Sequence, residues 1–357
     1  MSKKNLYLLG SRGVPNRYGG FEEFAEQILR VNAELACPLK IYVSCYGSEY
    51  IPSDTNIVFK RIFGNGFFAH VVYDFRSTAW TLFKSPGLVY HCGYGTSIPG
   101  IILLYPFLKL RGHKVCINLD GLEFERKKFS NIIKFLLKIE FYISQIISDI
   151  LVIDNPHLID YVKFRFREKC NYIPYGCERV KEVDSLKALS VLTSNAIRLG
   201  NYDLVIARME PENSIEEIVE VYNEIHYPLV ILSNHNSSFG TLIKSVSKKN
   251  IYFFEGYYGE DADFFRRNCR FYIHGHQVGG TNPSLLQAMQ SGCRILLRNN
   301  VFNSYVCKGP KWSNKFDLKA ILIQSNDYSE FISENFNKIT SEFSWKNVYN
   351  LTAKLAK

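Results

Sequence analysis

Short apolar runs alternate with longer segments of helical periodicity along the first half of the chain. The runs that we predict to be strands are Asn5–Leu9, Leu39–Cys45, Asn56–Ile62, Leu88–Cys92, Val115–Leu119, Ile150–Ile153 and Tyr172–Pro174. The predicted helices between them are Phe21–Ala36, His70–Lys84, Ile98–Arg111, Asn131–Ile147 and His157–Arg167. Such alternation is typical of a parallel sheet with helices on both faces.

A second series of the same kind follows the polar stretch Glu178–Asn201. Its predicted strands are Leu204–Ala207, Leu229–Ser233, Ile251–Phe254, Phe271–His274 and Arg294–Leu297. Its predicted helices are Ile215–Ile225, Asp261–Asn268 and Pro283–Ser291, and a last helix, Trp345–Leu355, follows them. We therefore expect an α/β protein with two Rossmann-like, doubly wound domains facing a cleft, residues 1–180 and 181–340, and with residues 341–357 packing back on the first domain.

The composition agrees with two globular domains. Of the 357 residues, 46% are hydrophobic and 22% are charged, and this length exceeds one ordinary core. The nine cysteines form no C-x-x-C pair, and several lie in apolar runs, which indicates free thiols in a reducing compartment rather than a zinc site. No apolar stretch reaches the ~20 residues that cross a bilayer, and no signal segment precedes the first strand. We expect a cytoplasmic protein without a metal ion.

The net charge of +9 fits nucleic acid, an anionic membrane surface or acidic small molecules. No RNP-like, zinc-finger or helix-turn-helix signature is present, which argues against nucleic acid. The basic residues Arg126, Lys127, Lys128, Lys134 and Lys138 cluster beside the apolar Phe129, Ile132, Ile133, Leu136 and Leu137. This segment is either a peripheral contact with the cytoplasmic face of a membrane or a core helix with a solvated basic face, and the sequence leaves both open.

A glycine-rich turn follows the first predicted strand. Glycines at a strand-to-helix turn let backbone amides approach a phosphate, and the helix N-terminus adds a positive dipole. The turn also carries two arginines and a tyrosine, although its spacing matches no dinucleotide or P-loop pattern. The alternative is a flexible turn with solvent-facing arginines. The candidate residues are Arg12, Arg17, Tyr18, Gly19 and Gly20.

The second half carries a matching turn after the strand Phe271–His274. Thr281 or Asn282 is a good helix cap and Pro283 a good first helical residue. Capping alone is the alternative, but it does not require His276 or the adjacent Gly279 and Gly280. We expect these residues to open helix-start amides to a ligand phosphate.

Charged residues follow two other predicted strands at their carboxyl ends. Arg208, which follows Leu204–Ala207, could neutralise a diphosphate leaving group. Asp120 and Glu123, which follow Val115–Leu119, could orient or deprotonate a sugar hydroxyl. A capped turn with solvated acids is the alternative for these carboxylates.

Five segments together resemble a known family. The sequence is similar to rhamnosyltransferase-type bacterial glycosyltransferases of the retaining glycosyltransferase family four, with the matching motifs in the same order over nearly the whole chain. The motifs are Gly10-Ser-Arg-Gly-Val-Pro-Asn-Arg-Tyr-Gly-Gly-Phe-Glu22, Asp120-Gly-Leu-Glu-Phe-Glu-Arg126, Ile173-Pro-Tyr-Gly176, Ala207-Arg-Met-Glu-Pro-Glu-Asn213 and Val278-Gly-Gly-Thr-Asn-Pro-Ser284.

This resemblance implies a GT-B fold, retention of anomeric configuration and no essential metal. It implies that Arg208 and Asp120 are the catalytic residues. The implied donor-binding residues are Gly19, Gly20, Arg208, Asn213, His276, Gly279, Gly280, Thr281, Asn282, Ser284 and Gln287. The implied acceptor-side residues are Arg12, Arg17, Tyr18, Glu123 and Arg126. Asn213 stands where many relatives have Lys, and Gly279 and Gln287 stand where many have a Glu pair.

The expected function is a hexosyltransferase that takes its sugar from a nucleotide diphosphate carrier. The resemblance makes dTDP-rhamnose the leading donor and a lipid-linked oligosaccharide of O-antigen or capsule synthesis the acceptor. In the expected mechanism the diphosphate binds between the two glycine turns, with Arg208 alongside. Two alternatives remain, a catalytically silent sugar-nucleotide-binding homologue and a GT-B epimerase or phosphorylase.

Overall fold

The computed structural model describes residues 5–16, 19–36, 38–45, 56–59, 66–178 and 183–356. The chain divides into two compact units, which we describe separately. Unit 1 comprises Met1–Phe124, Asn131–Gly176 and Trp345–Lys357, and unit 2 comprises Glu125–Ser130 and Cys177–Ser344.

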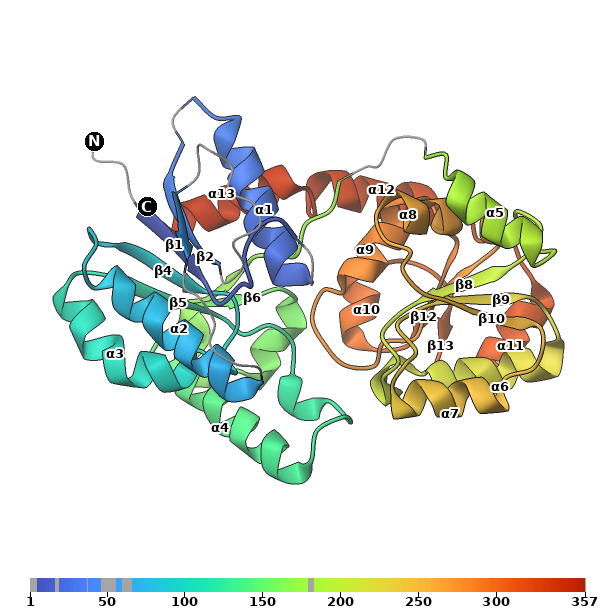
Figure 1. Ribbon diagram of the computed structural model, residues 1–357, viewed down its shortest axis with the longest axis horizontal. Helices are drawn as coiled ribbons and strands as arrows, with labels where there is room; N and C mark the ends of the chain where they lie inside the picture. Colours follow the sequence, from blue (N-terminus) through green and yellow to red (C-terminus); the bar gives the residue numbers. More distant parts are fainter. Residues whose placement is uncertain are drawn as a thin grey trace. The chain divides into compact units, whose positions relative to one another are not determined.

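Unit 1 contains a seven-stranded parallel sheet in the order β3-β2-β1-β4-β5-β6-β7 (Figure 1). Its strands are β1 (Asn5–Leu9), β2 (Lys40–Cys45), β3 (Asn56–Phe59), β4 (Gly87–His91), β5 (Lys114–Asn118), β6 (Ile150–Ile153) and β7 (Cys170–Tyr172). All five residues of β1 are buried, as expected for a central strand covered on both faces. The chain runs outward to β3 on one side and to β7 on the other, so its direction reverses between β1 and β4.

Helices cover both faces of this sheet. They are α1 (Gly20–Ala33), α2 (Phe67–Thr81), α3 (Ile98–Leu110), α4 (Asn131–Ile146) and α13 (Trp345–Leu355). Helices α1 and α13 pack together on one face, while α2, α3 and α4 lie on the other (Figure 1). Trp345, Val348 and Tyr349 of α13 share one hydrophobic cluster with Leu6 and Phe24. The core of unit 1 is therefore built from both ends of the sequence.

Unit 2 contains a six-stranded parallel sheet in the order β10-β9-β8-β11-β12-β13. Its strands are β8 (Asp203–Ile206), β9 (Leu229–Leu232), β10 (Ile251–Phe254), β11 (Tyr272–His274), β12 (Ile295–Arg298) and β13 (Lys311–Trp312). Its helices are α5 (Leu186–Ser194), α6 (Ile215–Ile225), α7 (Ser238–Val246), α8 (Glu260–Arg267), α9 (Pro283–Gln290), α10 (Val301–Val306), α11 (Lys315–Gln324) and α12 (Glu330–Ser341). The chain direction reverses between β8 and β11. Both units are doubly wound, as predicted.

Two predicted segments differ from the structure. His157–Arg167 is not one α-helix but two 3-10 helices, Pro156–Tyr161 and Phe164–Lys169, because Val162 between them is extended. The polar stretch Glu178–Asn201 contains α5, which begins where Ser185 Oγ accepts a hydrogen bond from Ala188 N.

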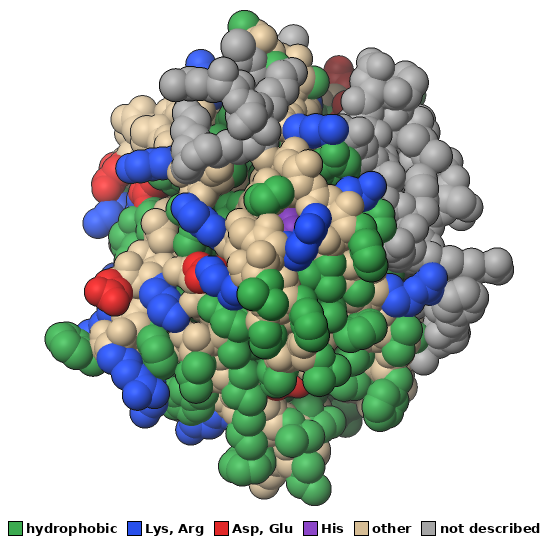
Figure 2. All heavy atoms as spheres, turned by 90° about the vertical axis from the view of Figure 1, so that its left-hand side faces the viewer, with side chains coloured by type: hydrophobic (Ala, Val, Ile, Leu, Met, Phe, Trp, Pro, Cys, Tyr) green, Lys and Arg blue, Asp and Glu red, His purple; other side chains and the backbone are tan. Residues whose placement is uncertain are grey.

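The surface of unit 1 over α2, α3 and α4 is unusually apolar. Apolar side chains gather on this face, with Lys and Arg among and around them (Figure 2). Among the described residues, no helix has the length and hydropathy needed to cross a membrane.

Candidate active site

The carboxyl ends of β8 and β11 form the candidate site of unit 2. The two strands are neighbours, and the chain direction reverses between them. Open α/β sheets bind ligands at such switch points. Arg208 lies just beyond β8, and Gly275 and His276 follow β11, so the fold brings these predicted residues to one edge of the sheet.

Three cations surround the carboxylate of Glu210. Lys128 Nζ donates to Glu210 Oε1 at 2.9 Å, and guanidinium nitrogens of Arg126 and Arg208 each lie 3.8 Å from the carboxylate. Burial acts to raise the pKa of Glu210, but the hydrogen bond from Lys128 and the nearby positive charges outweigh it and lower the pKa. The Arg208 side chain is 68% exposed, so the cluster keeps a net positive charge with one guanidinium open to a ligand. Arg126, which we predicted on the acceptor side, belongs to unit 2.

Asn213 braces the loop behind Arg208. Its side-chain amide donates to Arg208 O at 2.8 Å, and the residue is buried. Ser214 Oγ donates to Gly275 O and accepts from Gln277 Nε2, each at 2.8 Å. A Cβ on Gly275 would lie 2.2 Å from Asn213 O, so only glycine allows the two loops to approach. Asn213, predicted to bind the donor, positions backbone in this structure.

His276 is uncharged at neutral pH. Burial lowers its pKa to about 3, and the charges of Arg208 and Arg126 contribute to that lowering. Its ring stacks on His274 with centroids 4.5 Å apart, and its Nδ1 is buried without a hydrogen-bond partner among the described residues. His276 therefore offers a hydrogen bond rather than a charge.

The start of α9 is held by its own polar residues. Asn282 Oδ1 accepts from Ser284 N at 2.9 Å, which confirms Asn282 as the cap. The Ser284 hydroxyl lies 2.6 Å from Tyr272 OH and donates to Ile206 O at 3.1 Å. Ser284 is thus tied to the sheet, while the first turn of α9 contains no acid that would oppose an anion.

Gly279 and Gly280, which precede α9, differ in backbone conformation and in burial. Gly279 has a φ of 129°, a region that favours glycine, although a Cβ added there would meet no atom of the described residues within 4 Å. Gly280 is half-buried, and Thr281 is buried at 4% exposure. The turn therefore needs a particular backbone conformation, and a lack of space is not what selects glycine.

Gln287 is engaged by a buried arginine. Arg266 Nη2 donates to Gln287 Oε1 at 2.7 Å, and Arg266 Nη1 pairs with Asp263 Oδ1 at 2.7 Å. The side-chain carbonyl of Gln287 is therefore occupied, and a ribose hydroxyl would have to use its amide. Neither Arg266 nor Asp263 was predicted, because an arginine near a helix end reads as a surface residue.

Glu212 is a site residue that the sequence did not reveal. It is 3% exposed, and neither carboxylate oxygen has a hydrogen-bond partner among the described residues. Its backbone carbonyl accepts from Gln277 N at 2.9 Å, which places it at the same pair of loops. In the sequence Glu212 reads as a solvated acid in a short turn, and only packing shows that it is buried.

The candidate turn of unit 1 is rich in carboxylates. Glu22 and Glu23 lie in the first turn of α1, and Glu22 is buried. Glu22 Oε1 accepts from Arg12 N at 2.7 Å, and Glu23 Oε2 accepts from Asn16 Nδ2 at 2.6 Å. Gly19 precedes this turn in an extended conformation, with a φ of 174°.

The structure describes only some of the other predicted residues of this turn. Gly20 is the first residue of α1 and is half-buried, while Arg12 is exposed. Arg17 and Tyr18 lie outside the described residues. A role in binding donor or acceptor stays a prediction for all four.

Further acids converge at the carboxyl end of β4. Burial raises the pKa of the Cys92 thiol well above its ordinary value. The charges of Glu22, Asp74 and Asp120 add to that rise, so all three lie within electrostatic reach of Cys92. Burial also raises the pKa of the neighbouring Tyr94, and the charges of Glu123 and Asp120 add to that rise. The predicted Asp120 thus acts on the same thiol as Glu22 and Asp74, two acids that we did not predict.

Asp74 is the most deeply buried of these acids. Its Oδ2 accepts from Thr96 Oγ1 at 2.6 Å, and a Cβ on Gly10 would lie 3.9 Å from its Oδ1. Burial raises its pKa from 3.8 to about 7, although the hydrogen bond from Thr96 acts against this. Among the described residues, the switch point of unit 1 is therefore rich in carboxyl groups, where that of unit 2 carries a cluster of cations.

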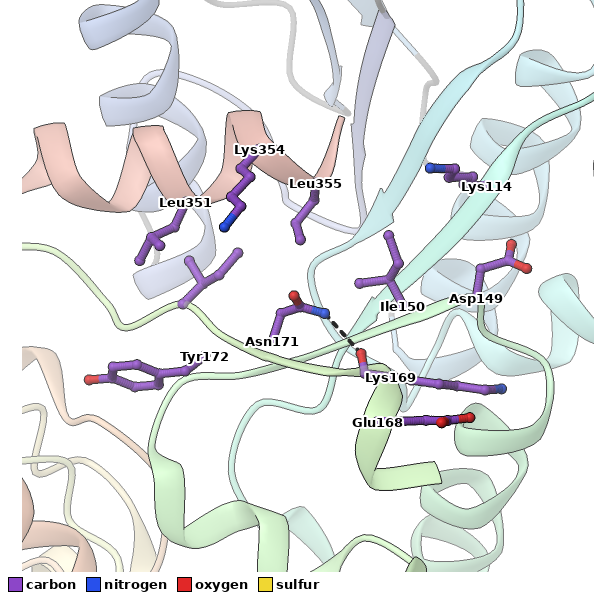
Figure 3. Close-up of a pocket in the computed structure, with 11 residues that line it drawn as sticks. Lys114, Asp149, Ile150, Glu168, Lys169, Asn171, Tyr172, Leu351, Lys354 and Leu355 are labelled. Atoms are coloured by element: carbon purple, nitrogen blue, oxygen red, sulfur yellow. Dashed lines mark hydrogen bonds between the residues drawn. The ribbon is translucent and has the colours of Figure 1, made fainter. Parts of the chain in front are cut away.

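A cavity of unit 1 lies away from these switch points. It has a volume of about 410 Å³ and lies at the amino ends of β5, β6 and β7 (Figure 3). Lys114, Asp149 and Asn171 line it with residues of α13, and Asn171 donates to Lys169 O at 3.0 Å. Ligands of open α/β sheets bind at the opposite edge. Within the described ranges, no group of His, Cys, Asp and Glu could hold a metal ion.

Comparison with known sequences finds one match, over a short part of the chain. A domain of unknown function (DUF1972) matches residues 3–62. A search of characterised proteins finds no significant match.

Comparison by structure establishes the fold. Sucrose-phosphate synthase from Thermosynechococcus elongatus is similar with a TM-score of 0.77 and 11% identity, covering 99% of this chain and 98% of that one. HepE from Anabaena in complex with UDP-glucose gives a TM-score of 0.71 and 10% identity, covering 99% of both chains. The lipopolysaccharide outer core galactosyltransferase WaaB gives 0.63 and 10%, covering 99% of this chain and all of that one. The chain has the GT-B fold of glycosyltransferases, as predicted.

Proposed function

We propose that the protein transfers a sugar from a nucleotide diphosphate donor to an acceptor hydroxyl. The observation that carries the proposal is the cation cluster of Arg208, Arg126 and Lys128 around Glu210, at the switch point of unit 2. Three cations and one carboxylate leave an excess of positive charge for a diphosphate. Its growing charge in the transition state is stabilised by such preorganised cations.

The start of α9 supplies a second set of groups for the donor. Its helix dipole favours an anion, and no acid in the first turn opposes one. The first amides of α9 are already bonded to Asn282, so the dipole rather than free N–H groups attracts the ligand. Neutral His276 and buried Glu212 lie at the adjoining loops, where sugar or ribose hydroxyls can satisfy them. The prediction that Gly19 and Gly20 share in holding the diphosphate stays a prediction.

The acidic switch point of unit 1 suits an acceptor better than a phosphate. Carboxylates accept hydrogen bonds from sugar hydroxyls, and they repel phosphates. In this proposal Asp120 and Glu123 orient the acceptor hydroxyl, and the departing phosphate takes its proton. The reaction retains the anomeric configuration and uses no metal, as the family resemblance implies.

Structures of similar fold support a nucleoside diphosphate donor. HepE is described in complex with UDP and with UDP-glucose, and WaaB is named as a lipopolysaccharide outer core galactosyltransferase. The motifs make dTDP-rhamnose the first donor to test and a lipid-linked oligosaccharide of O-antigen or capsule synthesis the first acceptor. The proposed place of action is the cytoplasmic face of the inner membrane.

The test is a donor screen with the purified full chain. Nucleoside diphosphates and their sugars are compared by thermal shift, because a ligand at about 100 times its dissociation constant stabilises the folded state by about 2.7 kcal/mol. The preferred donor is then incubated with lipid-linked acceptors, and transfer is followed by mass spectrometry. Stabilisation by none of the nucleotides would refute the proposal.

A silent sugar-nucleotide-binding homologue is the second candidate. It is favoured by Asn213, which replaces a cation and is buried, and by Gln287, whose carbonyl is occupied by Arg266. Binding of the donor without turnover, with or without acceptor, would decide for it. Turnover of the donor without any acceptor would instead indicate an epimerase.

A further inference from the structure

Helix α4 exposes a stripe of apolar side chains and buries two polar ones, unlike a helix that faces water. A surface helix normally turns its apolar stripe to the core and its polar side chains to solvent. In α4, Ser144 and Gln145 are buried, whereas Ile132 is 74% exposed and Leu136 and Ile139 are also exposed. The three exposed residues follow a spacing of four and three, so they form one stripe along the helix.

Helix α3, a neighbour of α4, has no polar face at all. Its thirteen residues include one charged side chain, Lys109. Ile101, Leu104 and Leu108 are buried against the unit, yet Leu103 and Phe107 are exposed. A helix that is apolar all round is normally buried in a core or in lipid.

Helix α2, which packs against α3, extends the same surface. Phe68, Val72 and Phe75 are exposed at a spacing of four and three, with Phe68 82% exposed. We call the exposed apolar side chains of these three helices the apolar face (Figure 2). It consists of Phe67, Phe68, Val72, Phe75, Ile102, Leu103, Phe107, Leu110, Ile132, Ile133, Phe135, Leu136, Ile139 and Ile146.

The apolar face is a concentrated feature of one unit. More than half of the large apolar side chains that are exposed in the described part of the chain lie between Phe67 and Ile146. Soluble monomers rarely expose contiguous apolar patches of more than a few hundred Å². A surface of this kind marks a site of interaction.

The charges around the apolar face are mainly positive, although Asp149, just beyond α4, pairs with Lys109 Nζ at 2.6 Å. Lys84, Lys109, Arg111, Lys134 and Lys138 lie on or beside the three helices, and Lys134 and Lys138 make no ion pair with another described residue.

The three helices carry only two acids in return. Asp74 is buried, and burial raises the pKa of Glu140 to about 7, so this carboxylate is partly protonated at neutral pH. The margin of the apolar face is therefore cationic.

We propose that the apolar face docks unit 1 on an anionic lipid bilayer. The apolar stripes enter the boundary between headgroups and acyl chains, and the lysines contact the lipid phosphates. Helix α3, with thirteen residues, is about 20 Å long by the helical rise. Because the hydrocarbon core is about 30 Å thick, the helix lies along the surface instead of crossing it.

Charge complementarity favours lipid over a second copy of the chain. A two-fold dimer brings the same patch of both subunits together. Lys134 and Lys138 would then approach their own copies without carboxylates to pair them, whereas anionic headgroups satisfy them. The sequence left a membrane contact open for the basic and apolar side chains of residues 126–138 only. In the structure Lys127 and Lys128 instead bond to Gln277 and Glu210 within unit 2, and α2 and α3 join the contact.

The docking proposal does not depend on the proposed function. Membrane binding is measured without donor or acceptor, so failure of either proposal leaves the other intact. Together they place a glycosyltransferase where a lipid-linked acceptor is found.

The test is flotation of the full chain with vesicles of phosphatidylcholine alone or mixed with phosphatidylglycerol. We expect binding to the anionic vesicles that weakens with salt. The variant Lys134→Glu/Lys138→Glu should lower the partition coefficient by about fivefold or more for each lysine. The variant Leu103→Gln/Phe107→Gln/Leu136→Gln should lower it by about tenfold or more.

A matched control carries the same kind of change on unit 2. Leu186, Phe316 and Ile323 are also exposed apolar residues, and their triple substitution by Gln should leave binding unchanged. Thermal melting of all variants checks that they fold. Absence of binding to anionic vesicles, or equal loss in the control, would overturn the proposal. So would a dimer of the free protein that the apolar-face variant dissociates, with no vesicle binding by the wild type.

Discussion

The turns that open α1 and α9 look alike in sequence and differ in charge. Each follows a central strand at the switch point of its sheet, and each has two adjacent glycines at or just before the helix start. The turn of unit 1 places Glu22 and Glu23 in the first helical turn, where they accept hydrogen bonds from the loop. The turn of unit 2 has no acid in that position, and the Arg208 cluster lies across the same sheet edge.

The difference shows that a glycine-rich strand-to-helix turn does not by itself define a phosphate site. The dipole and open amides of a helix start attract any anion, including the protein's own carboxylates. In unit 1 that attraction is already used by glutamates, so its candidate ligand is a hydroxyl compound. In unit 2 no acid competes for the helix dipole, although Asn282 accepts hydrogen bonds from the first amides of α9, and the nearby cations add to the attraction for an anion.

Removing the guanidinium of Arg208 should have the largest effect on transfer. We expect Arg208→Ala to lower kcat/KM for transfer by about 100-fold or more, because a cation aimed at a developing phosphate charge contributes most in the transition state. Arg198→Ala is the control, since Arg198 is exposed in the same unit after α5. Steady-state kinetics with donor and acceptor measure both, and unchanged transfer by Arg208→Ala would remove this residue from the mechanism.

Neutralising the buried acid of unit 1 should change the pH dependence of stability by a few kcal/mol. The pKa of Asp74 is raised from 3.8 to about 7 in the folded state. The folded state therefore binds more protons at this group than the unfolded state does between these values, so the contribution of Asp74 to stability is largest below about pH 4 and is lost as the pH rises to about 7. We expect Asp74→Asn to remove this fall and to raise the melting temperature at pH 7. The prediction is wrong if the melting temperatures of the variant and the wild type change in parallel from pH 4 to 8.

Replacing a glycine by alanine should lower stability by different amounts in the two turns. Gly279→Ala forces a side chain into a φ of 129° and should cost about 1–3 kcal/mol. Among the described residues, Gly19→Ala meets no closer atom than Glu22 Oε2 at 3.7 Å, in extended backbone, and should change stability by about 0.5 kcal/mol or less. Chemical denaturation of both variants checks the contrast, and equal losses would show that the turns have the same backbone requirement.

The smallest effect should come from making the Arg208 cluster of unit 2 more positive. Glu210→Gln removes the one carboxylate among three cations, and we expect nucleoside diphosphate affinity to rise by about fivefold or less, more at low salt. Calorimetric titration at two salt concentrations measures this. Weaker binding would mean that Glu210 positions the cations rather than neutralising one of them.

The fold could be predicted where the hydrophobic periodicity agrees with the turn residues that flank it. Buried central strands such as β1 and β6 appeared with their observed bounds, because a short apolar run between turn residues has few other interpretations. The two-residue strand β13 was missed, and so were the helices α5, α7, α10, α11 and α12. Their sequences are short or polar, and packing rather than propensity decides them.

The site could be predicted only where residue type and strand end coincide. Arg208 and the cap Asn282 follow from their places after β8 and before α9. Glu212 and Asp74 could not be recognised, because an acid in a turn or a helix reads as solvated until its neighbours are known. Gln287 was expected to face a ribose, and its bond to Arg266 depends on the packing of α8 against α9.

The place of α13 has a consequence for synthesis of the chain. Residues 177–344 form a continuous stretch whose ends are adjacent, with Cys177 N donating to Phe343 O at 2.6 Å. Unit 1, in contrast, needs Trp345 over Gly176 and the rest of α13 to complete its cluster. On the ribosome the half that is translated first is therefore the last to close, after most of the later half has already emerged.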